Sequence, residues 1–162
     1  MMEHDIVSVI QAMLAPGIMI SACGLLLLAI NNKYSMVVNR IRVLDEEKRK
    51  MKYQKKVSGL NDDEENRFHS ISIQTKKLNR RMLLIRNAII YYSIAVALFL
   101  ISCLFIGLQY IVMPDISRYT VVIFFLLGML SVLIGILYAI REVFKGYDIM
   151  QIEIDYTENL HK

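Results

Sequence analysis

Three long runs without a charged residue constrain this chain more than any other feature. They cover residues 6–32, 87–114 and 119–140 of the 162, and none contains Asp, Glu, Lys, Arg or His. A helix needs about 20 apolar residues to cross roughly 30 Å of hydrocarbon, and each run reaches that length. With 56% hydrophobic residues, the composition is also too apolar for a typical soluble domain. We therefore predict an all-α membrane protein with three transmembrane helices.

The basic residues predict how the chain is oriented. Of the 19 Lys and Arg residues, 15 lie between Lys33 and Arg86, whereas the N-terminal flank carries Glu3 and Asp5. Cytoplasmic loops carry the excess of Lys and Arg. We expect residues 1–32 to form an outside N-terminus and the first span, residues 33–86 a cytosolic segment, residues 87–140 the second and third spans with a short outer connection, and residues 141–162 a cytosolic tail.

Ile20-Ser21-Ala22-Cys23 matches the site at which bacterial lipoproteins are cleaved and lipidated. However, a secretory signal has a basic N-terminal region and its apolar stretch ends at the cleavage site. Here the N-terminal residues are acidic and the most apolar residues follow Cys23. We expect Cys23 to lie inside the first span and Cys103 inside the second, both as small apolar packing residues.

The cytosolic segment has the spacing of two coiled-coil helices. Apolar residues recur in steps of three and four along two seams: Tyr34, Val37, Ile41, Leu44, Lys48 and Met51 on the way out, and Phe68, Ile71, Thr75, Leu78, Met82 and Ile85 on the way back. One register pairs all twelve, for example Val37 with Met82. We predict a long antiparallel coiled-coil hairpin with its turn near residues 58–61, where Gly59 and the acidic run after Asn61 indicate a helix end and a helix start.

Small residues and basic residues suggest which surfaces the helices use. Small residues mark helix contacts in lipid, and we assign helix packing to Gly17, Ser21, Gly24, Ala95, Ser102, Gly128, Ser131 and Gly135. Basic residues at the inner ends of the spans are assigned to the membrane surface and to contact with anionic lipid: Lys33, Arg40, Arg42, Arg80, Arg81 and Arg86. The plainer interpretation of the basic residues is a solvated surface together with the orientation signal. Nothing in the sequence suggests nucleic-acid binding.

One heptad-spaced stripe of the first span, Gln11, Ile18, Leu25 and Asn32, is a candidate pore lining. In a ring of subunits it would give two polar mouths around two apolar constrictions, which gate by dewetting. The alternative is that a helix crossing lipid is simply polar at its ends and apolar between them.

Signals of catalysis are missing. His4, His69 and His161 are scattered, no Cys, Asp or Glu stands at metal-ligand spacing, and no phosphate-binding or nucleophile motif is present. We predict no enzymatic activity, no cofactor and no metal. The tail from residue 141 places Val143, Tyr147, Met150 and Ile154 on one helical face, although residues 152–156 alternate as a strand would; we favour an amphipathic helix.

The run from Ile10 to Leu44 resembles the opening of a family of small bacterial membrane proteins known as domain of unknown function 2721. The shared features are Pro16, the small residues 21–24, Asn32, and Arg40 and Arg42 as an Arg-x-Arg pair; an Asp often precedes that pair in the family, where this chain has Asn39. The likeness extends over most of the chain. It implies a three-helix protein of the bacterial inner membrane and no particular activity.

A looser, topological resemblance is to the TolQ and ExbB proton-channel subunits, which form rings. Two hypotheses of function follow. The first is a homo-oligomer, a ring of four or more subunits that encloses an apolar-gated ion pore. The second is a non-conducting scaffold or sensor subunit whose cytosolic hairpin docks a protein partner.

Overall fold

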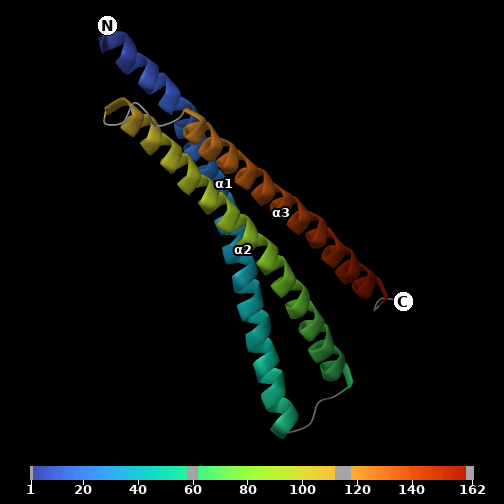
Figure 1. Cartoon of the computed structure of the whole chain (residues 1–162). Helices are drawn as coiled ribbons and strands as arrows, with labels where there is room; N and C mark the ends of the chain where they lie inside the picture. The colour runs from blue at the N-terminus through green and yellow to red at the C-terminus, as the bar shows by residue number, and fades with distance from the viewer. Residues whose placement is uncertain (1, 58–61, 112–117, 160–162) are drawn as a thin grey trace. The chain divides into compact units, whose positions relative to one another are not determined.

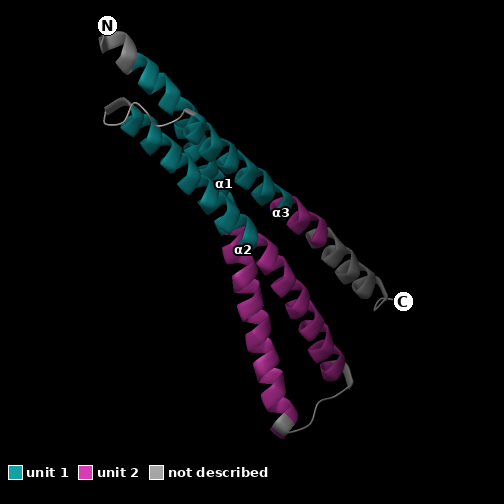
Figure 2. Ribbon diagram, in the orientation of Figure 1, with its two compact units in different colours: residues 1–31, 87–138 teal, residues 32–86, 139–162 magenta. Residues whose placement is uncertain are grey.

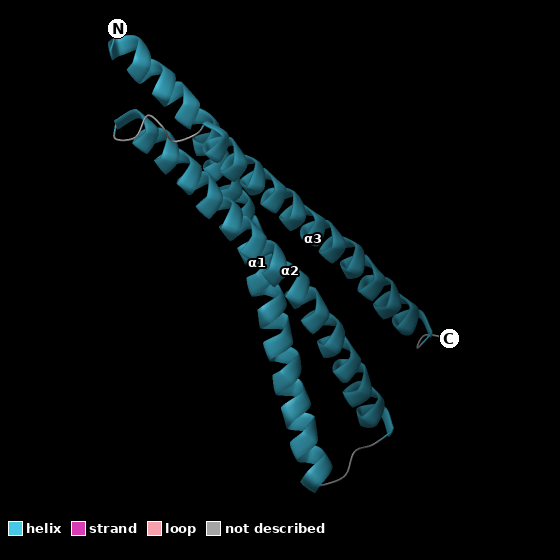
Figure 3. Cartoon of the chain, in the orientation of Figure 1, coloured by secondary structure: helices cyan, strands magenta, loops and turns pink. Residues whose placement is uncertain are grey.

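The computed structural model describes three α-helices, α1 (Met2–Val57), α2 (Asp62–Ile111) and α3 (Arg118–Asn159), with side chains described at residues 7–55, 57, 64–109 and 119–145. Figures 1 and 3 show these helices and, in grey, the residues left undescribed. The predicted turn near 58–61, with Gly59 and Asn61, and residues 112–117 of the predicted outer connection lie outside the described residues.

Each helix is long and apolar enough to cross a membrane. An apolar helix suits lipid because every backbone N–H and C=O must be satisfied within the segment. The prediction of an all-α chain with three helices able to span a membrane is therefore confirmed. Cys23 lies within α1, which is helical from Met2 and contains Pro16. The tail is helical to Asn159, so the alternation at residues 152–156 does not form a strand.

The chain divides into two compact units (Figure 2). Unit 1 contains Met1–Asn31 and Asn87–Tyr138, and unit 2 contains Asn32–Arg86 and Ala139–Lys162. These divisions fall within two residues of the span ends expected from the charges.

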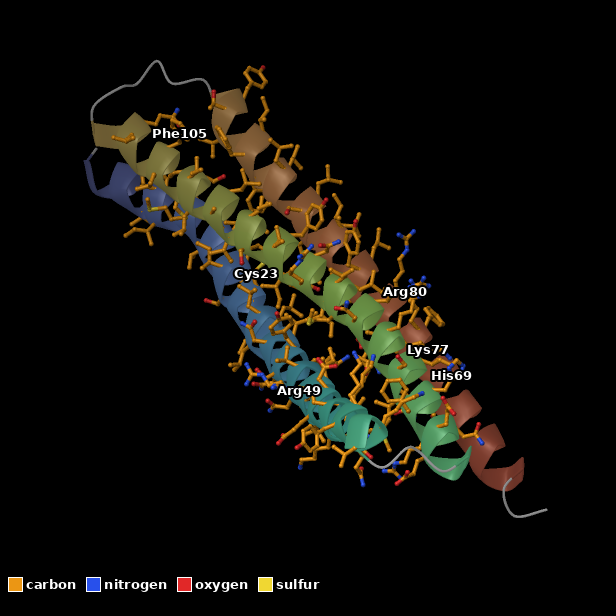
Figure 4. All side chains as sticks on the ribbon, turned by 90° about the horizontal axis from the view of Figure 1, so that it is seen from below. Cys23, Arg49, His69, Lys77, Arg80 and Phe105 are labelled. Atoms are coloured by element: carbon orange, nitrogen blue, oxygen red, sulfur yellow. The ribbon has the colours of Figure 1, made fainter. Side chains whose placement is uncertain are left out.

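In unit 1, α3 packs closely on α2. Aromatic rings of the two helices contact each other in three pairs, with centroids 5.4–5.5 Å apart: Tyr91 with Tyr138, Phe99 with Phe125, and Phe105 with Phe124. Figure 4 labels Phe105. The hydroxyl of Ser131 on α3 also donates a hydrogen bond of 2.7 Å to the carbonyl of Tyr91 on α2. In lipid, the hydrophobic effect does not drive helices together, so they associate through van der Waals packing and interhelical hydrogen bonds. The ring pairs and the Ser131 hydrogen bond are contacts of these two kinds.

In unit 2, α1 and α2 share an apolar cluster. Leu44 and Met51 of α1 pack with Ile71 of α2, and Phe68 and Leu78 lie against them. These five residues belong to the two seams derived from the sequence. Full burial of an apolar side chain contributes roughly 1.5–3 kcal/mol, which applies to the three buried members, and the two partly buried ones contribute less. The cluster gives the helices a shared core, whereas the coiled-coil geometry and its register stay predictions.

Charged contacts flank this cluster on the same two helices. Arg67 donates from Nη2 and Nε to Glu47 Oε1 at 2.6 and 2.9 Å, and Lys48 Nζ donates to Ser72 Oγ at 2.8 Å. Lys55 Nζ donates to Glu65 Oε1 at 2.7 Å, and this hydrogen bond lowers the pKa of the Glu65 carboxyl, which lies outside the three uncharged runs of the sequence. Exposed pairs of this kind contribute little to stability, but they favour one alignment of the two helices.

The predicted register can be tested by crosslinking. In the variant Val37→Cys/Met82→Cys, with the native cysteines replaced, oxidation should link the two positions within one chain because a disulfide requires Cα atoms about 4.4–6.8 Å apart. Mobility on a denaturing gel after cleavage between the two sites measures the yield. A higher yield for Val37→Cys paired with a cysteine at position 78 or 85 would show that the helices pair in another register.

Candidate functional site: a buried carboxylate between three helices

The most unusual side chain that the structure describes is Glu142 of α3. It follows the third apolar run by two residues, and its side chain is only 2% exposed. An ionised carboxylate taken out of water costs several kcal/mol unless it is paired and hydrogen-bonded. A buried glutamate in this position therefore requires partners.

Two cations from the other helices supply those partners. Arg81 of α2 donates from Nη2 at 2.6 Å and from Nε at 3.2 Å to Glu142 Oε1. Lys33 of α1 donates from Nζ at 3.3 Å to Oε2. Both carboxylate oxygens are thus bonded, and one residue from each helix contributes to the cluster.

The two cations differ in how much water they retain. The Arg81 side chain is 24% exposed and makes two of the three hydrogen bonds that described side chains donate to Glu142, whereas the Lys33 side chain is 49% exposed and makes one. Guanidinium suits this site because its planar donors hold a carboxylate at low hydration cost. Arg81 therefore provides most of the neutralisation of the Glu142 charge, and Lys33 provides a second contact that is more exposed to solvent.

The cluster lies within unit 2 and contains two cations against one carboxylate. Such an arrangement can join the three helices, because a cation from α1 and a cation from α2 donate to the same carboxylate of α3. In the part of the chain that the structure describes, no three His, Cys, Asp or Glu side chains are close enough to hold a metal ion together. We call Lys33, Arg81 and Glu142 the ionic clamp, because their ion pairs connect α1, α2 and α3.

The structure brings some of the predicted basic residues together and leaves the others apart. Lys33 and Arg81, assigned from the sequence to the membrane surface, bind Glu142. The remaining four are exposed: Arg40, Arg42, Arg80 and Arg86. Figure 4 labels Arg80, the residue that precedes Arg81. Glu142 is not among the residues predicted from the sequence, because it lies at the start of the segment expected to form the cytosolic tail.

The predicted packing residues also divide into two groups. A Cβ on Gly128 would lie 2.7 Å from the Phe99 ring and one on Gly135 would lie 2.8 Å from the Tyr92 ring, so both glycines allow close helix contact. Ala95, Ser102 and Ser131 are buried as well. Gly17 and Gly24 have open space around the same position, and Ser21 is exposed and bonds the carbonyl of Gly17.

The candidate pore residues share one environment. Gln11, Ile18, Leu25 and Asn32 are all exposed on α1, whereas Cys23 and Ile30 of the same helix are buried. A single chain therefore leaves this stripe to lipid, water or another subunit.

Comparison with known proteins places the chain in a family. The model of the family described as "Protein of unknown function (DUF2721)" matches residues 13–152. The chain belongs to the DUF2721 family. No curated protein and no solved structure matches it. The matched segment of this DUF2721 protein includes all three helices and the Lys33, Arg81 and Glu142 cluster, so the cluster lies within the family domain.

Proposed function

We propose that this DUF2721 protein is a homo-oligomer of the bacterial inner membrane in which α1 helices enclose an apolar-gated ion pore. The observation that carries the proposal is the exposed stripe of α1. Its apolar members, Ile18 and Leu25, lie between the polar Gln11 and Asn32 at a constant spacing of seven residues. A ring of such helices would enclose a pore with hydrated polar ends and a narrow apolar centre. Ions would pass only when the centre widens enough to hold water. The proposed role is not enzymatic.

The ionic clamp supports this proposal by its place in the chain. Lys33 follows Asn32, the inner member of the stripe, directly, and through Glu142 it is tied to α3 and to Arg81 of α2. A movement of α1 at the inner mouth would have to break or shift these ion pairs. The clamp thus gives the proposed pore a mechanical link to the segment between the first and second spans, which we place in the cytosol as a coiled-coil hairpin with the N-terminus outside.

The proposal is tested by ion flux into liposomes that contain the purified protein. Leu25→Asp should raise the flux several-fold because it hydrates an apolar constriction. Leu26→Asp is the matched control: Leu26 is also exposed, but one residue along α1 turns it about 100° away from the stripe. Native mass spectrometry should find four or more subunits, since two chains cannot enclose a channel with α1 alone.

Equal flux for the wild type, Leu25→Asp and Leu26→Asp would contradict the pore. The second hypothesis, a non-conducting scaffold or sensor whose hairpin docks a cytosolic protein, would then account for the basic surface of unit 2. A monomer or dimer in the mass spectrum would favour the same conclusion.

A further inference from the structure

Unit 2 leaves a second apolar row of α1 uncovered. The buried row consists of Val37, Leu44 and Met51. The preceding residues Met36 and Val43 are 65% and 56% exposed, and Tyr53 and Val57 further along are 72% and 70% exposed. These side chains come after residue 32, the predicted end of the first span, so we expect them to lie outside the lipid. Large apolar residues gathered on one exposed face indicate a contact surface.

The uncovered residues have the spacing of a coiled-coil seam of their own. Met36, Val43, Lys50 and Val57 recur every seven residues. Asn39, Glu46 and Tyr53 lie three positions after the first three of these, and Asn32 lies seven residues before Asn39 in the same row. They correspond to a and d positions. At 100° per residue the centre of this outer seam lies about 130° around α1 from the buried row. One helix thus carries two seams, of which its own chain fills one.

The same spacing continues toward the N-terminus with small residues. Counting back in sevens from Met36 gives Ala29, Ala22, Ala15 and Ser8, all of them exposed. Small residues at a constant interval let two helices approach closely in lipid. The helix that fills the outer seam must therefore cross the same membrane and continue beyond it. Helix α1 of a second copy satisfies both requirements, because α1 runs without interruption from Met2 to Val57.

Charges flanking the outer seam fit a parallel pair of α1 helices. In a parallel coiled coil each g residue lies near the e residue five positions later in the partner. This rule sets Arg42 against Glu47 of the second copy. Within the chain, Nε and Nη2 of Arg67 both donate to Glu47 Oε1, so Oε2 is the atom that we expect to accept from Arg42. The neighbouring pairings, Ser35 with Arg40 and Arg49 with Gln54, contain no like charges.

One polar layer interrupts the outer seam. Lys50 would face its counterpart, but Glu46 lies one layer away and already approaches Lys50 Nζ to 3.9 Å within the chain. In a pair of helices two carboxylates would then flank two ammonium groups. A single charged layer of this kind costs stability and fixes the register.

We propose that α1 pairs in parallel with α1 of a second copy through the seam formed by Met36, Val43, Tyr53 and Val57. The inference rests on the proposed homo-oligomer and specifies which surface builds it. It also places Gln11, Ile18, Leu25 and Asn32 at the d positions of the same seam, so that in a ring of four or more parallel α1 helices they face the central axis.

Disulfide crosslinking of the full chain in membranes tests the pairing. With Cys23 and Cys103 replaced by Ala, oxidation of the variant Val43→Cys should link most chains into covalent dimers. Lys52→Cys is the matched control, because Lys52 is exposed on the same helix but lies about 130° from the centre of the outer seam. We expect its yield to be several-fold lower. Met36→Cys should behave as Val43→Cys does.

The outcomes separate this inference from the pore. Equal yields for Val43→Cys and Lys52→Cys, or no link at Val43 and Met36, would overturn the α1 pairing even if flux and native mass spectrometry supported a conducting ring. Strong links at Val43 and Met36 together with a flux that Leu25→Asp does not change would support the pairing and reject the pore.

Discussion

Replacing Arg81 by Met should lower the free energy of unfolding by about 3–5 kcal/mol, because it leaves the buried carboxylate of Glu142 without its main partner. Two of the three hydrogen bonds to this carboxylate come from Arg81, and the side chain of Glu142 has almost no contact with water. Lys33 would remain, but its single bond of 3.3 Å to the other oxygen cannot replace the guanidinium. Equilibrium unfolding in mixed micelles measures the change.

The neighbouring arginine provides the control. Arg80→Met removes the same charge from an exposed position one residue away, so the change in unfolding free energy should stay within about 0.5 kcal/mol. Combining Arg81→Met with Glu142→Gln should restore part of the stability, because the uncompensated charge is then gone. A double variant no more stable than Arg81→Met alone would show that Arg81 acts through its packing and not through Glu142.

The clamp also shows where reasoning from the sequence stops. The spans could be predicted because, in a chain this apolar, an uncharged run of more than about 20 residues indicates a transmembrane helix. Glu142 could not be singled out, since its partners lie 61 and 109 positions away and no local pattern connects them. A glutamate two residues beyond an apolar run is as compatible with a solvated tail as with a buried ion pair. Only the continuation of α3 beyond Ile140 brings it to Arg81 and Lys33.

Glycines illustrate the same limit within the membrane segments. The same argument, that small residues let helices approach, predicts a packing role for both Gly24 and Gly135. The structure gives Gly135 an aromatic ring at contact distance and Gly24 open space. Spacing along one helix predicts which face carries small residues. It does not predict whether the helix that packs on that face belongs to the same chain or to another. For Gly24 the neighbour has to be sought in lipid or in another subunit.

Gly135→Ala should destabilise the protein by about 1–3 kcal/mol, the usual cost of overpacking, and Gly135→Leu by more. The new Cβ would lie 2.8 Å from Cε1 and 3.0 Å from Cδ1 of Tyr92, whose side chain is buried, so that a shift of the ring would disturb its neighbours. Helix α3 would have to move away from α2, which would also stretch the hydrogen bond from Ser131 to the carbonyl of Tyr91.

Thermal unfolding in detergent, compared with Gly24→Ala, measures this effect against a glycine of the same type in open surroundings. Gly24→Ala should be close to neutral, because nothing lies within 4 Å of the added methyl group. Truncating the ring removes the clash, so Gly135→Ala should cost less in a Tyr92→Leu background than in the wild type. The same loss in both backgrounds would mean that the glycine is needed for some reason other than its contact with Tyr92. A loss that disappears in the Tyr92→Leu background would establish that α2 and α3 depend on this single point of close approach.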